Sequence, residues 1–178
     1  MTPEATATES GTYAGVKTAK QRLLEQYEMN HAKTLKVLKA FPGDKSEFRP
    51  HERCSTALQL AWKFVIEEQL LLTAVQGNQV LGGGFPPAPE TWDAVLDAFM
   101  KGYDDVVAAL RDPRNADLSG SVTFFVAPKK TGDFPIPDFA SFMLDDQIHH
   151  RGQMSIYVRM AGGKVPAIYG PSADEPWF

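Results

Sequence analysis

Two polar residues stand on the core-facing side of a predicted helix near the end of the chain. At about 100° per residue, the apolar residues of the segment 138–161 gather on one stripe, and Asp146 and His150 lie on the same stripe. They are four positions apart, so both side chains can converge on one point. The neighbouring Asp145 and His149 fall toward the outer edge. An aspartate among core positions is costly unless it has a partner, a water-filled pocket or a cation beside it.

A second polar pair is predicted on the helix at about 55–76. Lys63 and Glu67, again four positions apart, project from its apolar face. If the two helices are neighbours at the same height, these residues and the pair Asp146 and His150 form one buried polar cluster. In a plainer explanation, Lys63 extends its ammonium group to water, Glu67 lies at the edge of the stripe, and His150 is merely hydrogen-bonded.

The elements that must position these residues are four long helices. Apolar residues recur at three- and four-residue spacing in each, and proline and glycine interrupt the pattern between them. The expected helices span about residues 16–40, 55–76, 92–110 and 138–161. The segment 121–126, SVTFFV, is strand-like but stands alone, so we interpret it as an ordered loop. The sequence therefore predicts an all-α four-helix bundle with long loops and an extended C-terminal tail.

Length and composition indicate one globular domain. The chain has 178 residues, of which 43% are hydrophobic and 22% charged. Residues 1–12 lack hydrophobic periodicity and are expected to be a flexible leader, followed by a single domain at 13–178.

Charge and hydropathy exclude several partners. The net charge is −4 without a basic run, so nucleic acid is not an expected partner. Charged residues interrupt the most apolar stretch, 57–75, and no membrane span is predicted. Cys54 is the one cysteine and cannot form an intramolecular disulfide, and the N-terminus does not have the pattern of a signal peptide. A cytoplasmic location is therefore expected.

One segment of the last helix resembles a known family. Residues 145–153, DDQIHHRGQ, followed by Tyr157 and Arg159, are similar to the C-terminal helix of the DinB/YfiT-like metalloenzyme superfamily. The resemblance extends to FRPHERCSTALQLAW at 48–62 and covers most of residues 15–175. It implies a four-helix bundle, often dimeric, that holds a divalent cation through three residues, usually histidines. Members with known activity include transferases that use mycothiol or bacillithiol, and some hydrolases and isomerases, so a low-molecular-weight thiol is an implied cofactor.

The resemblance carries over to the ligand positions only in part. The last histidine of the triad corresponds to His150, and the position four earlier, often histidine, is Asp146 here. In the family, the remaining ligand is a histidine that directly follows a tryptophan on the second helix. The corresponding residues of this chain are Trp62 and Lys63. A protonated lysine has no lone pair and repels a divalent cation.

Three arrangements follow from this departure. In the first, which we favour because it needs no rearrangement, the Lys63 ammonium bridges Asp146 and Glu67 in a metal-free site, with Lys63, Asp146 and His150 as the catalytic residues. In the second, Glu67, Asp146 and His150 bind a divalent ion such as zinc or nickel while Lys63 swings aside. In the third, His31 reaches in as a substitute ligand.

These features favour an enzyme-type pocket between the second and fourth helices. The expected function is a thiol-dependent transferase or hydrolase that acts on a small molecule, with an altered metal site. The alternative is a non-catalytic homodimer that binds a small ligand or has a structural role. A second apolar side of the helix at 55–76, with Leu58, Val65 and Leu72, favours a self-association surface in either case.

Overall fold

The computed structural model describes residues 17–82, 84–115 and 118–178. It is mostly helical, as the sequence predicts, with the four long helices close to their expected positions. The helices are α1 (Ala19–Ala40), α2 (Ala57–Val75), α3 (Trp92–Arg111) and α4 (Ile136–Met160). Two short 3₁₀ turns, η1 (Gly43–Lys45) and η2 (Pro113–Asn115), and two strands, β1 (Ser121–Ala127) and β2 (Lys130–Pro135), complete the elements. The leader expected at 1–12 lies outside the described residues.

Three of the four helices begin at a threonine cap. Thr18 and Thr56 accept hydrogen bonds from the backbone N–H groups three positions on, and Gln21 and Gln59 reach back to the cap backbone in both cases. Thr91 caps α3 by accepting a hydrogen bond from the backbone N–H of Ala94. Such caps satisfy N–H groups that have no partner within the helix, so they fix where each helix starts.

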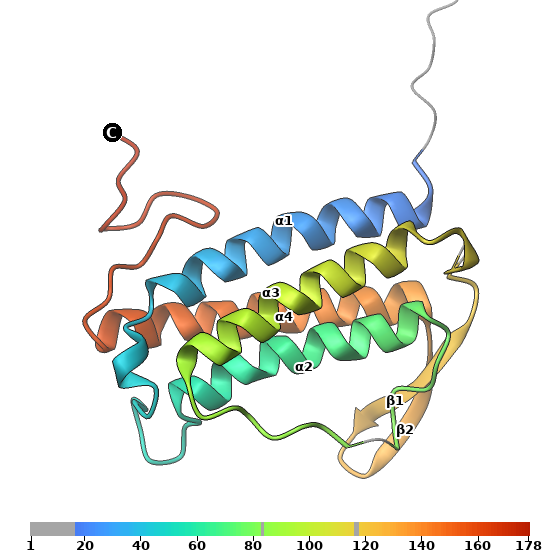
Figure 1. Ribbon diagram of the computed structural model, residues 1–178, viewed down its shortest axis with the longest axis horizontal. Coiled ribbons are helices and arrows are strands. Elements are labelled where there is room, and N and C mark those ends of the chain that lie inside the picture. Colours follow the sequence, from blue (N-terminus) through green and yellow to red (C-terminus); the bar gives the residue numbers. More distant parts are fainter. Residues whose placement is uncertain (1–16, 83, 116–117) are drawn as a thin grey trace, which may run out of the picture.

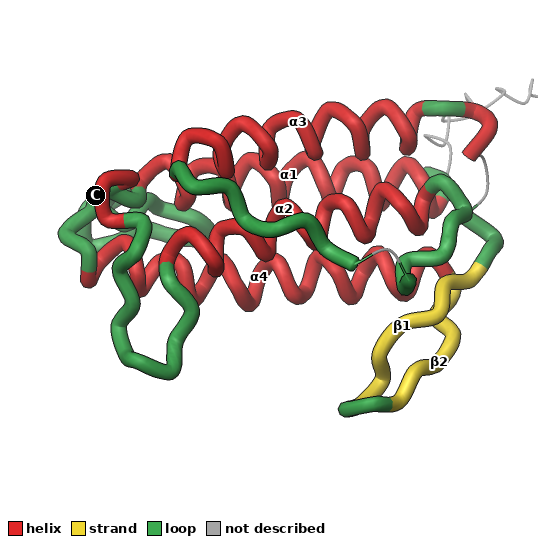
Figure 2. The backbone as a smooth tube through the Cα atoms, turned by 60° about the horizontal axis from the view of Figure 1, so that its bottom comes forward, coloured by secondary structure: helices red, strands yellow, loops and turns green. Residues whose placement is uncertain are grey.

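The helices pack so that α1 contacts α3 and α4, and α2 contacts the same two helices. The described parts of the long connection between α2 and α3, 76–82 and 84–91, run back along the outside. As a result α2 and α3 point in the same direction while α1 and α4 point in the other (Figures 1 and 2). The helices α2 and α4 are therefore antiparallel neighbours. The polar cluster predicted from the sequence requires these two helices to be adjacent.

The prediction that the segment 121–126 is a loop is wrong, and the fold is not purely helical. This segment lies in β1, which pairs with β2 as an antiparallel hairpin projecting from one end of the helices (Figure 2). The partner strand reads KTGDFP, which lacks the alternation of apolar residues that identifies a strand. The hairpin is anchored by Phe124, whose ring lies 5.2 Å from that of Phe139 on α4.

The core divides into two hydrophobic clusters, one toward each end of the helices. Tyr27, Leu71 and Phe139 belong to the cluster near the hairpin, and Leu38, Phe64 and Met154 belong to the other. Between them lies a layer of buried polar side chains, which we call the central polar layer. Its members are Asn30, His31, Thr34, Glu67, Glu68, Gln147, His150 and Arg151.

The self-association surface expected on α2 is mostly covered within the chain, and of its three residues Leu72 stays partly exposed. Leu58 and Val65 are buried within the chain, at 7% and 2% exposure, because α2 packs on both α3 and α4. The exposed large apolar residues of the helices include Ile156 and Met160 on α4 instead. A homodimer stays a prediction.

Over the described part of the chain, the helices are either too short or too polar for a membrane-spanning segment.

Candidate metal centre

Two side chains of the central polar layer meet a third, less buried one between α2 and α4. Glu67 on α2 and Asp146 and His150 on α4 each offer one ligand atom, and these atoms all lie within 4.8 Å of one another. His150 Nδ1 is 2.5 Å from Glu67 Oε1 and 3.8 Å from Asp146 Oδ1. The structure thus brings together the residues of the second predicted arrangement, which we call the triad.

Burial sets the charge state of the triad. Glu67 is 4% exposed, and this burial raises the pKa of its carboxyl to about 7, although the hydrogen bond with His150 opposes the shift. The nearby Asp146 carboxylate raises the pKa of Glu67 further. Glu67 Oε2 is buried and has no hydrogen-bond partner within the described chain. Asp146 is about one third exposed, so the triad is open to solvent on one side.

Lys63 does not take the role expected in the favoured arrangement. It is half-buried on α2, one turn before Glu67, and among the described residues it makes no ion pair or hydrogen bond. The predicted bridge from the Lys63 ammonium to Asp146 and Glu67 is therefore not formed. The side chain instead borders a hollow that begins next to the triad.

His31, the substitute ligand of the third arrangement, belongs to a different group of side chains. His31 Nδ1 lies 2.8 Å from Glu68 Oε1, and Tyr27 donates its hydroxyl to the same oxygen at 2.8 Å. The imidazole ring is stacked on Phe99 at 4.3 Å and lies 4.4 Å from the Tyr103 ring. These contacts hold His31 toward α3 and away from the triad.

Glu68 is the residue of the central polar layer whose role the sequence argument missed. Its carboxyl is fully buried, and burial raises its pKa well above the ordinary value. Burial also lowers the pKa of His31 to about 4, so this imidazole is neutral at pH 7, and burial favours the protonated form of Glu68 as well. The helix carrying Glu68 is apolar almost all round, and the sequence therefore gives no sign of which acidic residue faces α1 and α3.

The neutral His31 leads to a pH-dependent prediction. Its pKa is about 4 in the fold and 6.5 in a free side chain, so its contribution to stability is present above pH 6.5 and is lost as the pH falls toward 4. The destabilisation caused by His31→Gln should therefore shrink by up to about 3 kcal/mol between pH 7 and pH 4. Urea unfolding across this range measures the difference, and the exposed His51→Gln serves as the control. A deficit for His31→Gln that is the same at both pH values would contradict the neutral imidazole.

Comparison with known proteins places the chain in a family. A family model described as the DinB family matches residues 15–177. The chain belongs to the DinB family. This confirms the resemblance, which covers most of residues 15–175.

The relatives of this DinB chain are distant in sequence. The uncharacterized protein YrdA of Bacillus subtilis (strain 168) is 24% identical over 153 residues, which cover 85% of this chain and 89% of YrdA. A DinB-like protein from Bacillus cereus ATCC 10987 superposes with a TM-score of 0.68 at 24% identity, covering 83% of this chain and 95% of that one. The DinB-like protein YjoA of Bacillus subtilis gives a TM-score of 0.64 at 13% identity, covering 80% and 94%. These structures support the fold alone.

Arg151, next to the triad in this DinB chain, is not part of it. The guanidinium is 1% exposed and donates to the Asn30 carbonyl at 3.0 Å, to Thr34 Oγ1 at 3.0 Å and to the hydroxyl of Tyr169 in the C-terminal tail. Arg159 pairs with Asp174 at 2.6 Å and holds a later part of the tail. Both arginines therefore bind the tail to the helices.

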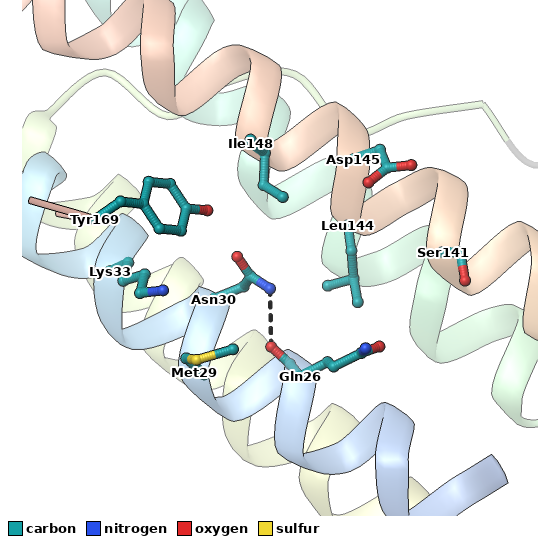
Figure 3. A pocket seen from close by; sticks show the side chains of 9 residues that line it. All are labelled: Gln26, Met29, Asn30, Lys33, Ser141, Leu144, Asp145, Ile148 and Tyr169. Atoms are coloured by element: carbon teal, nitrogen blue, oxygen red, sulfur yellow. Dashed lines mark hydrogen bonds between the residues drawn. The ribbon is translucent and has the colours of Figure 1, made fainter.

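Two hollows flank α4 on different sides. One lies between α1, α4 and Tyr169 and contains none of the triad residues (Figure 3). Its lining residues are Gln26, Met29, Asn30, Lys33, Ser141, Leu144, Asp145, Ile148 and Tyr169. The other, of about 390 Å³, lies between α2 and the second half of α4 and is lined by Cys54, Ser55, Leu60, Lys63, Gln153, Ile156 and Tyr157. Lys63 and Gln153 are each about one turn from the triad along α2 and α4, so this second hollow, which we call the Lys63 hollow, lies next to it.

Proposed function

We propose that this DinB protein binds a divalent metal ion through Glu67, Asp146 and His150 and is a metal-dependent transferase or hydrolase acting on a small molecule. The observation that carries the proposal is the convergence of three ligand atoms from two helices within 4.8 Å. Lys63, which the sequence argument placed among the catalytic residues, takes no part in holding the ion.

The residues fit a cation on chemical grounds. Glu67 Oε2 is a buried oxygen without a partner in the described chain, and an ion in the triad would supply that partner. One imidazole and two carboxylates form a donor set suited to zinc or nickel, and the second carboxylate also suits manganese. A bound ion would act as a Lewis acid or would lower the pKa of a coordinated water or thiol.

The chain's own residues have defined tasks in this proposal. His150 must present an unprotonated ring nitrogen, and Glu67 must lose its proton, so metal binding competes with protons. The partial exposure of Asp146 leaves a side from which water or substrate can enter. A low-molecular-weight thiol is the proposed co-substrate of the transferase form, and the Lys63 hollow offers space next to the triad for one reactant.

The non-catalytic alternative accounts less well for Glu67. A polar group that only fixes the register of two helices is expected to be fully paired, because a partly satisfied buried network is destabilising. Glu68 Oε2 also lacks a partner in the described chain, but Glu67 Oε2 lies beside two further ligand groups, Asp146 and His150, and this combination is better explained by a ligand.

Two adjacent aspartates provide a matched test. Asp146 belongs to the triad, whereas Asp145 lines the hollow on the α1 side of α4. After treatment with a chelator, the parent should bind one zinc, nickel or manganese ion per chain in calorimetric titrations. Asp146→Asn should weaken this binding by at least about ten-fold, and Asp145→Asn should leave it unchanged. Absence of stoichiometric binding of all three ions to the parent, or equal effects of both variants, would overturn the proposal.

A further inference from the structure

Lys63 is a cation without an ion-pair partner among the described residues. It is half-buried at the wall of the Lys63 hollow, and within the described chain it has no ion pair or hydrogen bond. The other residues lining the hollow carry no carboxylate: Cys54, Ser55, Leu60, Gln153, Ile156 and Tyr157. A partly buried ammonium group gains most from a negatively charged partner, because water screens the pair incompletely there.

The charges of the triad strengthen this preference once an ion is bound. A divalent cation balances the ionised carboxylates of Glu67 and Asp146, and the Lys63 ammonium then remains as the surplus charge next to the hollow. Without the ion, the same carboxylates lie one turn away along α2 and α4 and would repel an anion. The proposed metal and the lysine therefore both favour a negatively charged ligand.

The remaining residues that line the hollow indicate the chemistry of the uncharged part of such a ligand. Leu60 and Ile156 contribute aliphatic surface, and Tyr157 contributes its ring while its hydroxyl donates to the Ser55 carbonyl at 2.9 Å. The Gln153 side chain is a neutral polar group that can donate to an oxygen. A hollow of about 390 Å³ with this lining has room for a short apolar chain.

We propose that the Lys63 hollow binds a small organic monocarboxylate, with the carboxylate paired to the Lys63 ammonium and the apolar chain against Leu60 and Ile156. The inference rests on the proposed function, because it identifies the substrate class of the enzyme proposed above. It also explains why a lysine can stand next to a cation site: the bound anion lies between the two positive charges and attracts both.

The test compares hexanoate with hexanamide, its neutral isostere, on the full chain with and without Zn²⁺. Titrations followed by ¹H–¹⁵N NMR should shift the Gln153 side-chain amide and the Lys63 backbone amide on addition of hexanoate to the zinc-loaded parent. Hexanamide should bind at least about ten-fold more weakly. Lys63→Met, which keeps the length of the side chain and removes its charge, should lose a similar factor, whereas Lys63→Arg should retain most of the affinity.

Lys39→Met is the matched control, because it removes one positive charge from an exposed position on α1. Its affinity for hexanoate should equal that of the parent. Equal binding of hexanoate and hexanamide, equal binding by the parent and Lys63→Met, or no hexanoate binding at tens of millimolar would each overturn the inference. Failure of the zinc titration alongside Lys63-dependent hexanoate binding would instead remove the metal proposal and keep the ligand class.

Discussion

Replacing Glu67 by glutamine should weaken metal binding by more than about 100-fold and, in the metal-free protein, should raise stability above pH 7. The first effect follows because the amide is a poor ligand and carries no charge to offset the cation. The second follows because Glu67 is buried and its Oε2 has no partner in the described chain. A substitution that removes a function while stabilising the fold is the signature of a residue retained for chemistry.

The pH dependence of this stabilisation has a defined sign. Burial raises the pKa of Glu67 from 4.5 to about 7, so between these values the folded protein holds a proton that the unfolded chain has released. The contribution of Glu67 to stability therefore falls as the pH rises from 4.5 to 7, by at most about 3 kcal/mol. Glu67→Gln carries no such proton, so it should gain about 2 kcal/mol at pH 8 and almost nothing at pH 4.5.

Urea unfolding of chelator-treated protein at both pH values measures the gain, and a zinc titration of the same samples measures the loss of affinity. Glu52→Gln, at an exposed position before α2, is the control for a change of one charge. A loss of stability at pH 8 would show that Glu67 is ionised and favourably paired with His150. The buried acid would then be structural.

Gly102→Ala should be among the most destabilising single substitutions in the chain, at about 3 kcal/mol. A Cβ atom at this position on α3 would overlap Glu68 Oε2. The Glu68 carboxyl cannot easily withdraw, because Tyr27 and His31 both hold its other oxygen at 2.8 Å. The glycine therefore provides the space in which the buried carboxyl lies.

Gly152 on α4 provides the opposite case. A Cβ atom there would have no atom within 4 Å outside its own helix, so Gly152→Ala should stabilise the protein by about 0.5 to 1 kcal/mol through helix propensity alone. Thermal and urea unfolding of both variants give the comparison. Equal effects of the two substitutions would mean that the carboxyl of Glu68 moves freely and that the central polar layer is loosely packed.

The helices could be predicted because their boundaries and faces are local properties of the sequence. The period of the apolar residues and the breakers between them place all four close to the observed bounds, and the spacing of Asp146 and His150 correctly predicts that their side chains meet. The orientation of Lys63 could not be predicted from helical periodicity. Lys63 and Glu67 differ by only 40° around α2, but the packing of α4 decides which of the two faces the buried centre.

The sequence also failed to predict the strand β2 and the role of Glu68, and these two failures have related causes. The strand β2 is identified by its partner β1 and not by its own composition, since a hairpin is stabilised by cross-strand pairing. Glu68 is likewise identified by Tyr27, His31 and Gly102 on two other helices. Single-helix periodicity contains no information on such partners, and a helix that is apolar almost all round offers no preferred face to begin with.

The attachment of the tail has a consequence for the order in which the protein matures during translation. Arg151 lies on α4, and its outermost hydrogen bond is to Tyr169, in the segment that follows this helix. Its remaining partners, Asn30 and Thr34, emerge from the ribosome early. The guanidinium can thus be enclosed on its outer side only after Tyr169 has also emerged, so this part of the core is completed later than the packing of α4 against α1.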